Sequence, residues 1–361
     1  MKKLIAAVLA AALMSTGLCF AADAELSQSN DPVLISLDTI EQIWRENSPE
    51  LKKLDSTLAV SKRTYDRLKD SVDDLVDAAL YDVTMYMQYK SLQNSRDQAE
   101  CAYEVAVVQR EQSIQNDILA AKQDFLTCWQ DELNLEALRD TLSRQQARLD
   151  SFSEGLSRGY LSQSSYDNLK DEADGLQNKL DGLQAKAEAD EITLKAKLGL
   201  DTGSPTEYRY PELNGDSFAS LVALDPEADQ AEMLENSVSL KALQITYDSM
   251  KSPKHFYATT QQIADAKLNL SMARRNLETG YTLLSQSLTS QYEDLQNSYT
   301  SLDREKEKLD RLQSQYDRGL VSAQVLSSLN SEYISLKCSV QVKESSLYGI
   351  YLSYLNMVAG N

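Results

Sequence analysis

The residue types that carry most enzyme and metal chemistry are sparse in this chain. His255 is the only histidine, and it lies beside Pro253 and Lys254 with no cluster of cysteines or carboxylates around it. A histidine that acts as a base or a metal ligand needs such partners nearby. We therefore interpret His255 as a loop residue, and the sequence predicts no metal site and no cofactor.

The remaining candidate groups also favour structural roles. Cys101, Cys128 and Cys338 form no CxxC pair, so we interpret them as small buried side chains and not as a disulfide framework. The pair Asp73-Asp74 and the charged run 303–308 are typical of solvated helix faces. Phosphate-binding glycine loops, serine elbows and His-Glu-x-x-His helices do not occur. The sequence predicts that the protein is not an enzyme.

The first 22 residues predict a cleaved signal peptide. Lys2 and Lys3 precede the apolar run 4–14 and then a zone of small residues that includes Ala21 and Ala22. The run is shorter than the roughly 20 residues that a membrane-spanning helix needs. Cys19 raises lipid attachment as an alternative, but it follows Leu18, where such sites prefer a small residue. Cleavage is favoured, and we expect an exported protein.

The mature chain is strongly acidic. The full sequence has a net charge of −19, and loss of Lys2 and Lys3 makes it more negative still. This charge disfavours nucleic acid and anionic lipid surfaces as partners. Every later stretch of sufficient length carries several charges, so we expect no membrane-spanning helix in the rest of the chain either.

Proline is absent from two long stretches, one between Pro49 and Pro205 and the other from Pro253 to the C-terminus. Because proline breaks helix interiors, both stretches are free to form long helices. A short helix is expected over 36–48. The expected organisation is a signal peptide at 1–22, a first helical-hairpin repeat at 23–200, a linker at 201–225 and a second repeat at 226–361.

An internal repeat supports this division. Leucines recur every seventh position before one glycine, and a matching series precedes a second glycine 160 positions later. The members are Leu135, Leu142, Leu149 and Leu156 in the first series, and Leu295, Leu302, Leu309 and Tyr316 in the second. Seven-residue spacing predicts a helix seam that a partner helix covers, as in an antiparallel coiled coil.

The two series lead into the same kind of turn. The segments share the pattern Arg-Gly-x-Leu/Val-Ser, with Arg158, Gly159, Leu161 and Ser162 in the first and Arg318, Gly319, Val321 and Ser322 in the second. Glycine can adopt the left-handed conformation that ends a helix, and serine can cap the start of the next one. Each turn is therefore predicted to be the tip of a helical hairpin.

A second repeated element precedes each hairpin. Residues 47–54 and 236–243 share the pattern Asn-Ser-x-x-Leu-Lys-x-Leu. Their offset is 189 instead of 160, so the first repeat carries about 29 extra residues, which we place between Asp70 and Gln98.

In the order and doubling of these elements the chain resembles the TolC-like outer-membrane efflux protein family. The residues that carry the resemblance are the Asn-x-Pro-Glu-Leu segment at 47–51, the turns at 159–162 and 319–322, and the helix ends at Leu198-Gly199 and Ala359-Gly360. The resemblance implies an all-α protomer of two tandem antiparallel coiled-coil hairpins. It also implies a homotrimer whose helices form a hollow cylinder in the cell envelope, at the outer membrane or in the periplasm.

The same resemblance implies the function of a duct component in efflux or type I secretion. The hairpin tips, at the eight residues of the two turns, would dock a periplasmic adaptor (membrane fusion) protein that works with an inner-membrane ABC or RND pump. The alternative is an exported coiled-coil envelope protein with a structural or regulatory role.

Two features depart from the family pattern. Family members carry a strand insert for the membrane barrel in each repeat, but here the second slot holds only 250–260 and the first only a weak alternation at 83–89. Little or no barrel insert is therefore expected. An acidic residue is common six places after each tip glycine, where this chain has Ser165 and Val325, so no carboxylate gate is expected there.

Overall fold

The computed structural model describes residues 32–361 except 161, 216, 219–220, 222–223 and 253–257. The expected signal peptide at 1–22 lies outside the described residues, and so do Leu161 and His255. Within the described part, eight helices and two short strands follow one another. They are β1 (Val33–Ile35), α2 (Ile40–Asn47), α3 (Pro49–Ala79), α4 (Val83–Ser157), α5 (Gln163–Lys197), β2 (Thr206–Tyr208), α6 (Pro226–Asn236), α7 (Val238–Lys251), α8 (Thr260–Asp317) and α9 (Ala323–Val358).

The helices begin at residues suited to cap them. Ser162 Oγ and Ser322 Oγ accept backbone amides at the starts of α5 and α9. Thr259 starts α8 with a reciprocal capping box to Gln262. Each of these side chains satisfies an amide that the first helical turn leaves without a partner.

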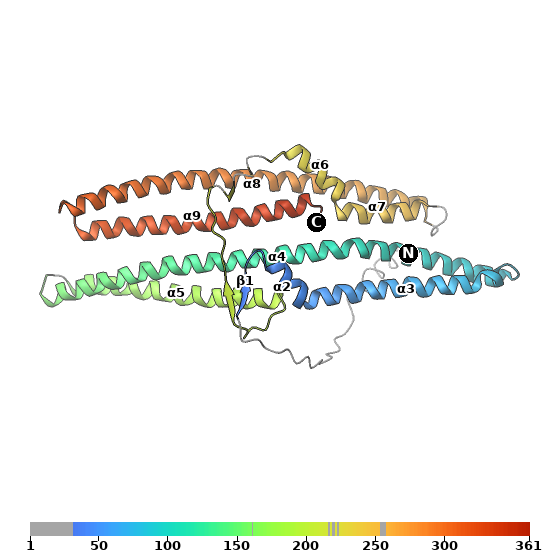
Figure 1. The fold of residues 1–361 in the computed structure, drawn as a ribbon, viewed down its shortest axis with the longest axis horizontal. Helices are drawn as coiled ribbons and strands as arrows, with labels where there is room; N and C mark the ends of the chain where they lie inside the picture. The colour runs from blue at the N-terminus through green and yellow to red at the C-terminus, as the bar shows by residue number, and fades with distance from the viewer. Residues whose placement is uncertain (1–31, 161, 216, 219–220, 222–223, 253–257) are drawn as a thin grey trace.

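The long helices lie side by side in an elongated layer (Figure 1). The 75-residue α4 runs along nearly the whole layer and packs against α3 at one end, against α5 at the other, and against α7 and α9 of the second repeat. The 58-residue α8 packs in the same way against α7 and α9. At a rise of 1.5 Å per residue, α8 is about 87 Å long. The expected all-α fold of two tandem helical hairpins is confirmed.

The extra residues of the first repeat lengthen two helices. In the first repeat α3 has 31 residues and α4 has 75, whereas α7 has 14 and α8 has 58. Each of the first pair is thus 17 residues longer, and the link between them is five residues shorter, which accounts for the 29. The weak strand-like alternation at 83–89 was misleading, because these residues form the first turns of α4, capped by Asp82.

Two hydrophobic cores lie near the middle of the layer. In the first repeat, Trp44 and Ile40 of α2 are buried against Phe125 of α4 and Leu194 of α5. In the second, Phe218 and Met233 join a row along α8 and α9. The heptad seams extend from these cores: Leu135, Leu142 and Leu295 are buried, but burial declines toward the tips. Tyr316, the last seam member, is 40% exposed and was wrongly expected to be covered.

Candidate functional site: two hairpin tips and the middle of the layer

The first tip ends α4 with a left-handed glycine. Gly159 has φ +75°, its N–H donates to Leu156 O at 3.0 Å, and the Tyr160 N–H donates to Gly155 O at 2.9 Å. This pair of bonds is the Schellman arrangement, which satisfies carbonyls at a helix end. Ser162 Oγ then accepts the Ser165 N–H at 3.2 Å and starts α5.

The second tip has the same geometry. Gly319 has φ +71°, its N–H donates to Tyr316 O at 2.8 Å, and the Leu320 N–H donates to Gln315 O at 3.0 Å. Ser322 Oγ accepts the Val325 N–H at 3.4 Å. The two tips lie at the same end of the layer, on the left of Figure 1. The fold thus brings the two sets of predicted site residues to one end of the molecule.

The tips are open to solvent. A β-carbon built on Gly159 or Gly319 would meet no atom within 4 Å. Arg158 and Arg318 are exposed, and Arg158 forms only a solvent-exposed ion pair with Glu154 at 3.5 Å. The residues after the glycines, Tyr160 and Leu320, are 80% and 71% exposed. Each tip therefore presents a glycine, an arginine and an apolar side chain to solvent.

Two other glycines with positive φ are crowded. A β-carbon on Gly360 would lie 2.5 Å from the carbonyl atoms of Asn236, and one on Gly199 would lie 2.7 Å from the Asn47 carbonyl carbon. The repeated Asn-Ser element therefore contacts the C-terminal end of the last helix in each repeat. Sequence analysis singled out all four residues but did not predict these contacts.

The strands β1 and β2 were also missed. They pair in parallel, with Val33 opposite Thr206 and Ile35 opposite Tyr208. Beyond β2, Tyr210 and Leu213 pack on the cluster of Leu126, Trp129 and Cys338, which joins α4 to α9. The linker therefore fastens the two repeats together on one face of the layer.

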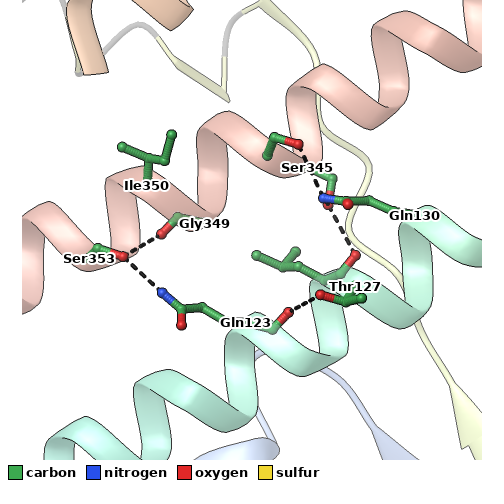
Figure 2. A pocket seen from close by; sticks show the side chains of 9 residues that line it. Gln123, Thr127, Gln130, Ser345, Gly349, Ile350 and Ser353 are labelled. Atoms are coloured by element: carbon green, nitrogen blue, oxygen red, sulfur yellow. Dashed lines mark hydrogen bonds between the residues drawn. The ribbon is translucent and has the colours of Figure 1, made fainter. Parts of the chain in front are cut away.

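The opposite face carries a shallow pocket between α4 and α9, lined by both polar and apolar side chains. It has a volume of about 200 Å³ and is lined mainly by uncharged side chains. Gln123 Nε2 donates to Ser353 Oγ at 2.9 Å, and Gln130 Nε2 donates to Ser345 Oγ at 3.2 Å. Figure 2 shows these glutamines reaching from α4 to α9, with the linker passing behind both helices. Short polar side chains and Gly349 thus form the contact between the repeats on this face.

Buried polar groups are concentrated in the middle of the layer. Burial raises the pKa of the Glu344 carboxyl, and the hydrogen bond that Tyr299 donates at 2.6 Å opposes part of that rise. Tyr281 and Tyr354 hydroxyls lie 2.8 Å apart, and Tyr354 also donates to Asp229. These side chains pack between α6, α8 and α9, so they stabilise the second repeat.

Burial raises the pKa of all three cysteine thiols in the described part of the chain. All three described cysteines are free, Cys128 and Cys338 are buried, and Cys101 is half-buried. Burial raises the pKa of Cys128 to about 12, which keeps the thiol protonated and unreactive at neutral pH.

Among the described residues, no group of three or more His, Cys, Asp or Glu side chains could hold a metal ion. No helix in the same residues is both long and apolar enough to cross a membrane.

Comparison with known proteins identifies the fold. No protein-family profile matches the chain, and no curated protein sequence does. Solved structures do match. The chain is similar to CusC, whose structures concern transmembrane channel formation, with a TM-score of 0.59 and 11% identity, over 90% of this chain and 92% of that one.

Two outer-membrane proteins match over a similar length. One is the CmeC outer membrane channel of Campylobacter jejuni, with a TM-score of 0.55 and 10% identity over 96% of this chain and 94% of CmeC. The other is the outer membrane protein VceC of Vibrio cholerae, with a TM-score of 0.56 and 9% identity over 90% and 96%. The chain therefore has a TolC-like fold, as its repeats and turns indicated.

Proposed function

We propose that this protein is a duct component of an efflux or type I secretion system. Three copies would close into a helical cylinder, and the six hairpin tips would dock a periplasmic adaptor that works with an inner-membrane ABC or RND pump. The observation that carries the proposal is the pair of matching tips. Two sequence-distant hairpins end in the same Schellman turn and serine cap, at one end of a TolC-like layer.

The two faces of the layer suit a duct. The linker and its strands cover one face, and the pocket between α4 and α9 opens on the other (Figure 2). We assign the second face to the lumen because Gln123, Gln130 and Ser353 are polar and uncharged there. Such a lining stays hydrated without holding an ion tightly.

The tips suit close docking. Gly159 and Gly319 have open space where a β-carbon would be, so another backbone can approach them closely. Arg158 and Arg318 place a cation beside each glycine, suited to a partner carboxylate. Tyr160 and Leu320 add exposed apolar surface.

The test is the double variant Gly159→Glu/Gly319→Glu. A β-carbon at a left-handed position costs about 1 kcal/mol, so the fold should survive, while an unpaired carboxylate in a tight contact should greatly weaken docking. Efflux-dependent resistance and adaptor pull-down are measured beside thermal melting, with Gly175→Glu/Gly182→Glu on α5 as the control, because a β-carbon at either position would also meet no atom within 4 Å. Unchanged transport and binding would refute tip docking.

The oligomeric state tests the duct itself. Light scattering of the purified protein at micromolar concentration should give the mass of a trimer. A strictly monomeric species would contradict the closed cylinder and favour the alternative, an exported coiled-coil envelope protein with a structural or regulatory role.

A further inference from the structure

The end of the layer opposite the tips carries a bare apolar hairpin. It is formed by the end of α3, the link 80–82 and the first turns of α4, and we call it the α3–α4 prong, residues 76–90. Its exposed apolar side chains are Val76, Leu80, Tyr81, Val83, Met85, Tyr86 and Met87, with Tyr81 at 90% and Val83 at 81% exposure. Such a patch on one feature marks an interaction site.

None of the described helices of the second repeat runs alongside the prong. The Cys101 thiol on α4 lies beside Thr246 and Ser249, and α7 ends two residues later at Lys251. The part of α4 before that level therefore extends past α7, as Figure 1 shows on the right. The 17 added residues of α3 and of α4 correspond to about 25 Å of helix.

We propose that the α3–α4 prong docks in the interface of a zwitterionic lipid bilayer. All residues from Tyr81 to Gln88 are exposed, so apolar side chains point to every side of the tip. A bilayer interface surrounds a projecting tip, whereas a protein partner covers one face of it. A neighbouring copy in a cylinder would also present an α7 and α8 that stop short of the prong.

The flanking residues fit this interface. Lys90 Nζ lies 5.8 Å from the ring centre of Tyr86 and 5.9 Å from that of Tyr89. Tyrosine and lysine together are typical of membrane–water boundaries, where the ring is partly buried and the ammonium reaches the headgroups.

The charged side chains of the prong determine how deeply it inserts and which lipid headgroups it prefers. Asp82 stands at the apex, where Oδ1 accepts the Thr84 and Met85 amides at 2.6 and 3.3 Å, and its charge limits insertion to the headgroup level. Asp70, Asp73, Asp74 and Asp77 on α3 are all exposed. Between 70 and 95, Lys90 is the single basic residue. This acidic collar repels anionic lipids and favours zwitterionic headgroups.

The proposal is independent of the duct proposal, because vesicle binding needs neither an adaptor nor a pump. The exported, purified protein is floated with phosphatidylcholine vesicles, and mass spectrometry establishes its N-terminus, which all variants share. Leu80→Ser/Tyr81→Ser should lower the vesicle-bound to free ratio about tenfold or more, since both side chains lose their apolar contact. Tyr160→Ser/Leu320→Ser is the matched control, with the same residue types and 80% and 71% exposure at the opposite end, and should change binding less than twofold.

Two further measurements sharpen the test. Tyr81→Trp should bind at least as well, and its indole emission should shift to the blue with vesicles, because the two native tryptophans, Trp44 and Trp129, are buried. Phosphatidylglycerol in the vesicles should weaken binding, and salt should restore it. The proposal is overturned if the wild type stays unbound, or if both double variants lose binding equally. A prong variant that changes only the oligomeric state would instead identify a second copy as the occupant, which also overturns it.

Discussion

In the described part of the chain, four glycines have positive φ, and they form two pairs with the same backbone geometry and opposite surroundings. Gly159 and Gly319 end α4 and α8 at the tips, with open space around them. Gly199 and Gly360 follow α5 and α9 in the middle and press on the backbone of Asn47 and Asn236. One motif therefore serves two purposes. At the tips it leaves a surface free for a partner, and in the middle it closes each repeat on itself.

The largest expected effect distinguishes these pairs. Gly199→Ala and Gly360→Ala should each lower the free energy of unfolding by roughly 2–5 kcal/mol, because the β-carbon adds a backbone clash to the left-handed strain. Gly159→Ala and Gly319→Ala, as matched controls, should each cost only about 1 kcal/mol. Urea unfolding of the four variants measures the difference. Equal losses at all four positions would show that the crowding in the middle does not matter.

Sequence analysis predicted the tips because their chemistry is local. Arg158 to Ser162 and Arg318 to Ser322 contain the glycine, the cap and the end of the heptad series within a few residues. The two hairpins and the short helix before Pro49 follow from similar short-range signals, although that helix begins at Ile40 and not at Ser36. Leu161 lies outside the described residues, and docking at the tips stays a prediction.

The middle could not be predicted because its contacts are distant in sequence. Asn47 meets Gly199, and Val33 pairs with Thr206, but nothing local links either pair. A three-residue strand is too short to show a period.

The α3–α4 prong was missed for another reason. The alternation at 83–89 resembled a weak strand. In the structure these residues are the first turns of α4, which begins at Val83 after Asp82, a good helix cap.

A smaller effect follows from the buried Glu344 carboxyl of the second repeat. Burial raises its pKa in the folded state above the unfolded value. The folded state then holds more protons between the two values, so this group's contribution to stability falls as pH rises from the unfolded pKa through the folded one. The Glu344→Gln variant stays neutral at every pH. Its free energy of unfolding should therefore rise relative to that of the wild type as the pH increases through this range.

The control for this pH series is Tyr299→Phe. It removes the hydroxyl that donates to Glu344 at 2.6 Å, which should raise the pKa of the carboxyl further and cost about 1–3 kcal/mol at neutral pH. Urea unfolding at several pH values measures both variants. If the difference between Glu344→Gln and wild type does not change with pH, the carboxyl is not buried as described.

The smallest expected effect compares the two closing contacts with each other. In the second repeat the Val238 N–H donates to Gly360 O at 2.9 Å. The corresponding residue of the first repeat, Pro49, has no amide hydrogen, so that bond cannot form beside Gly199.

Val238→Pro gives the second repeat the proline that the first repeat has at this position. It removes one hydrogen bond, worth about 1 kcal/mol, but proline is favoured at the first position of a helix and restricts the unfolded chain, which offsets part of the loss. The net loss in urea unfolding should therefore stay below about 1 kcal/mol, whereas Val238→Ala, which keeps the amide, serves as the control. A loss as large as that of Gly360→Ala would mean that the second repeat is closed chiefly by this hydrogen bond. The first repeat, which lacks the bond, would then be closed by a different contact.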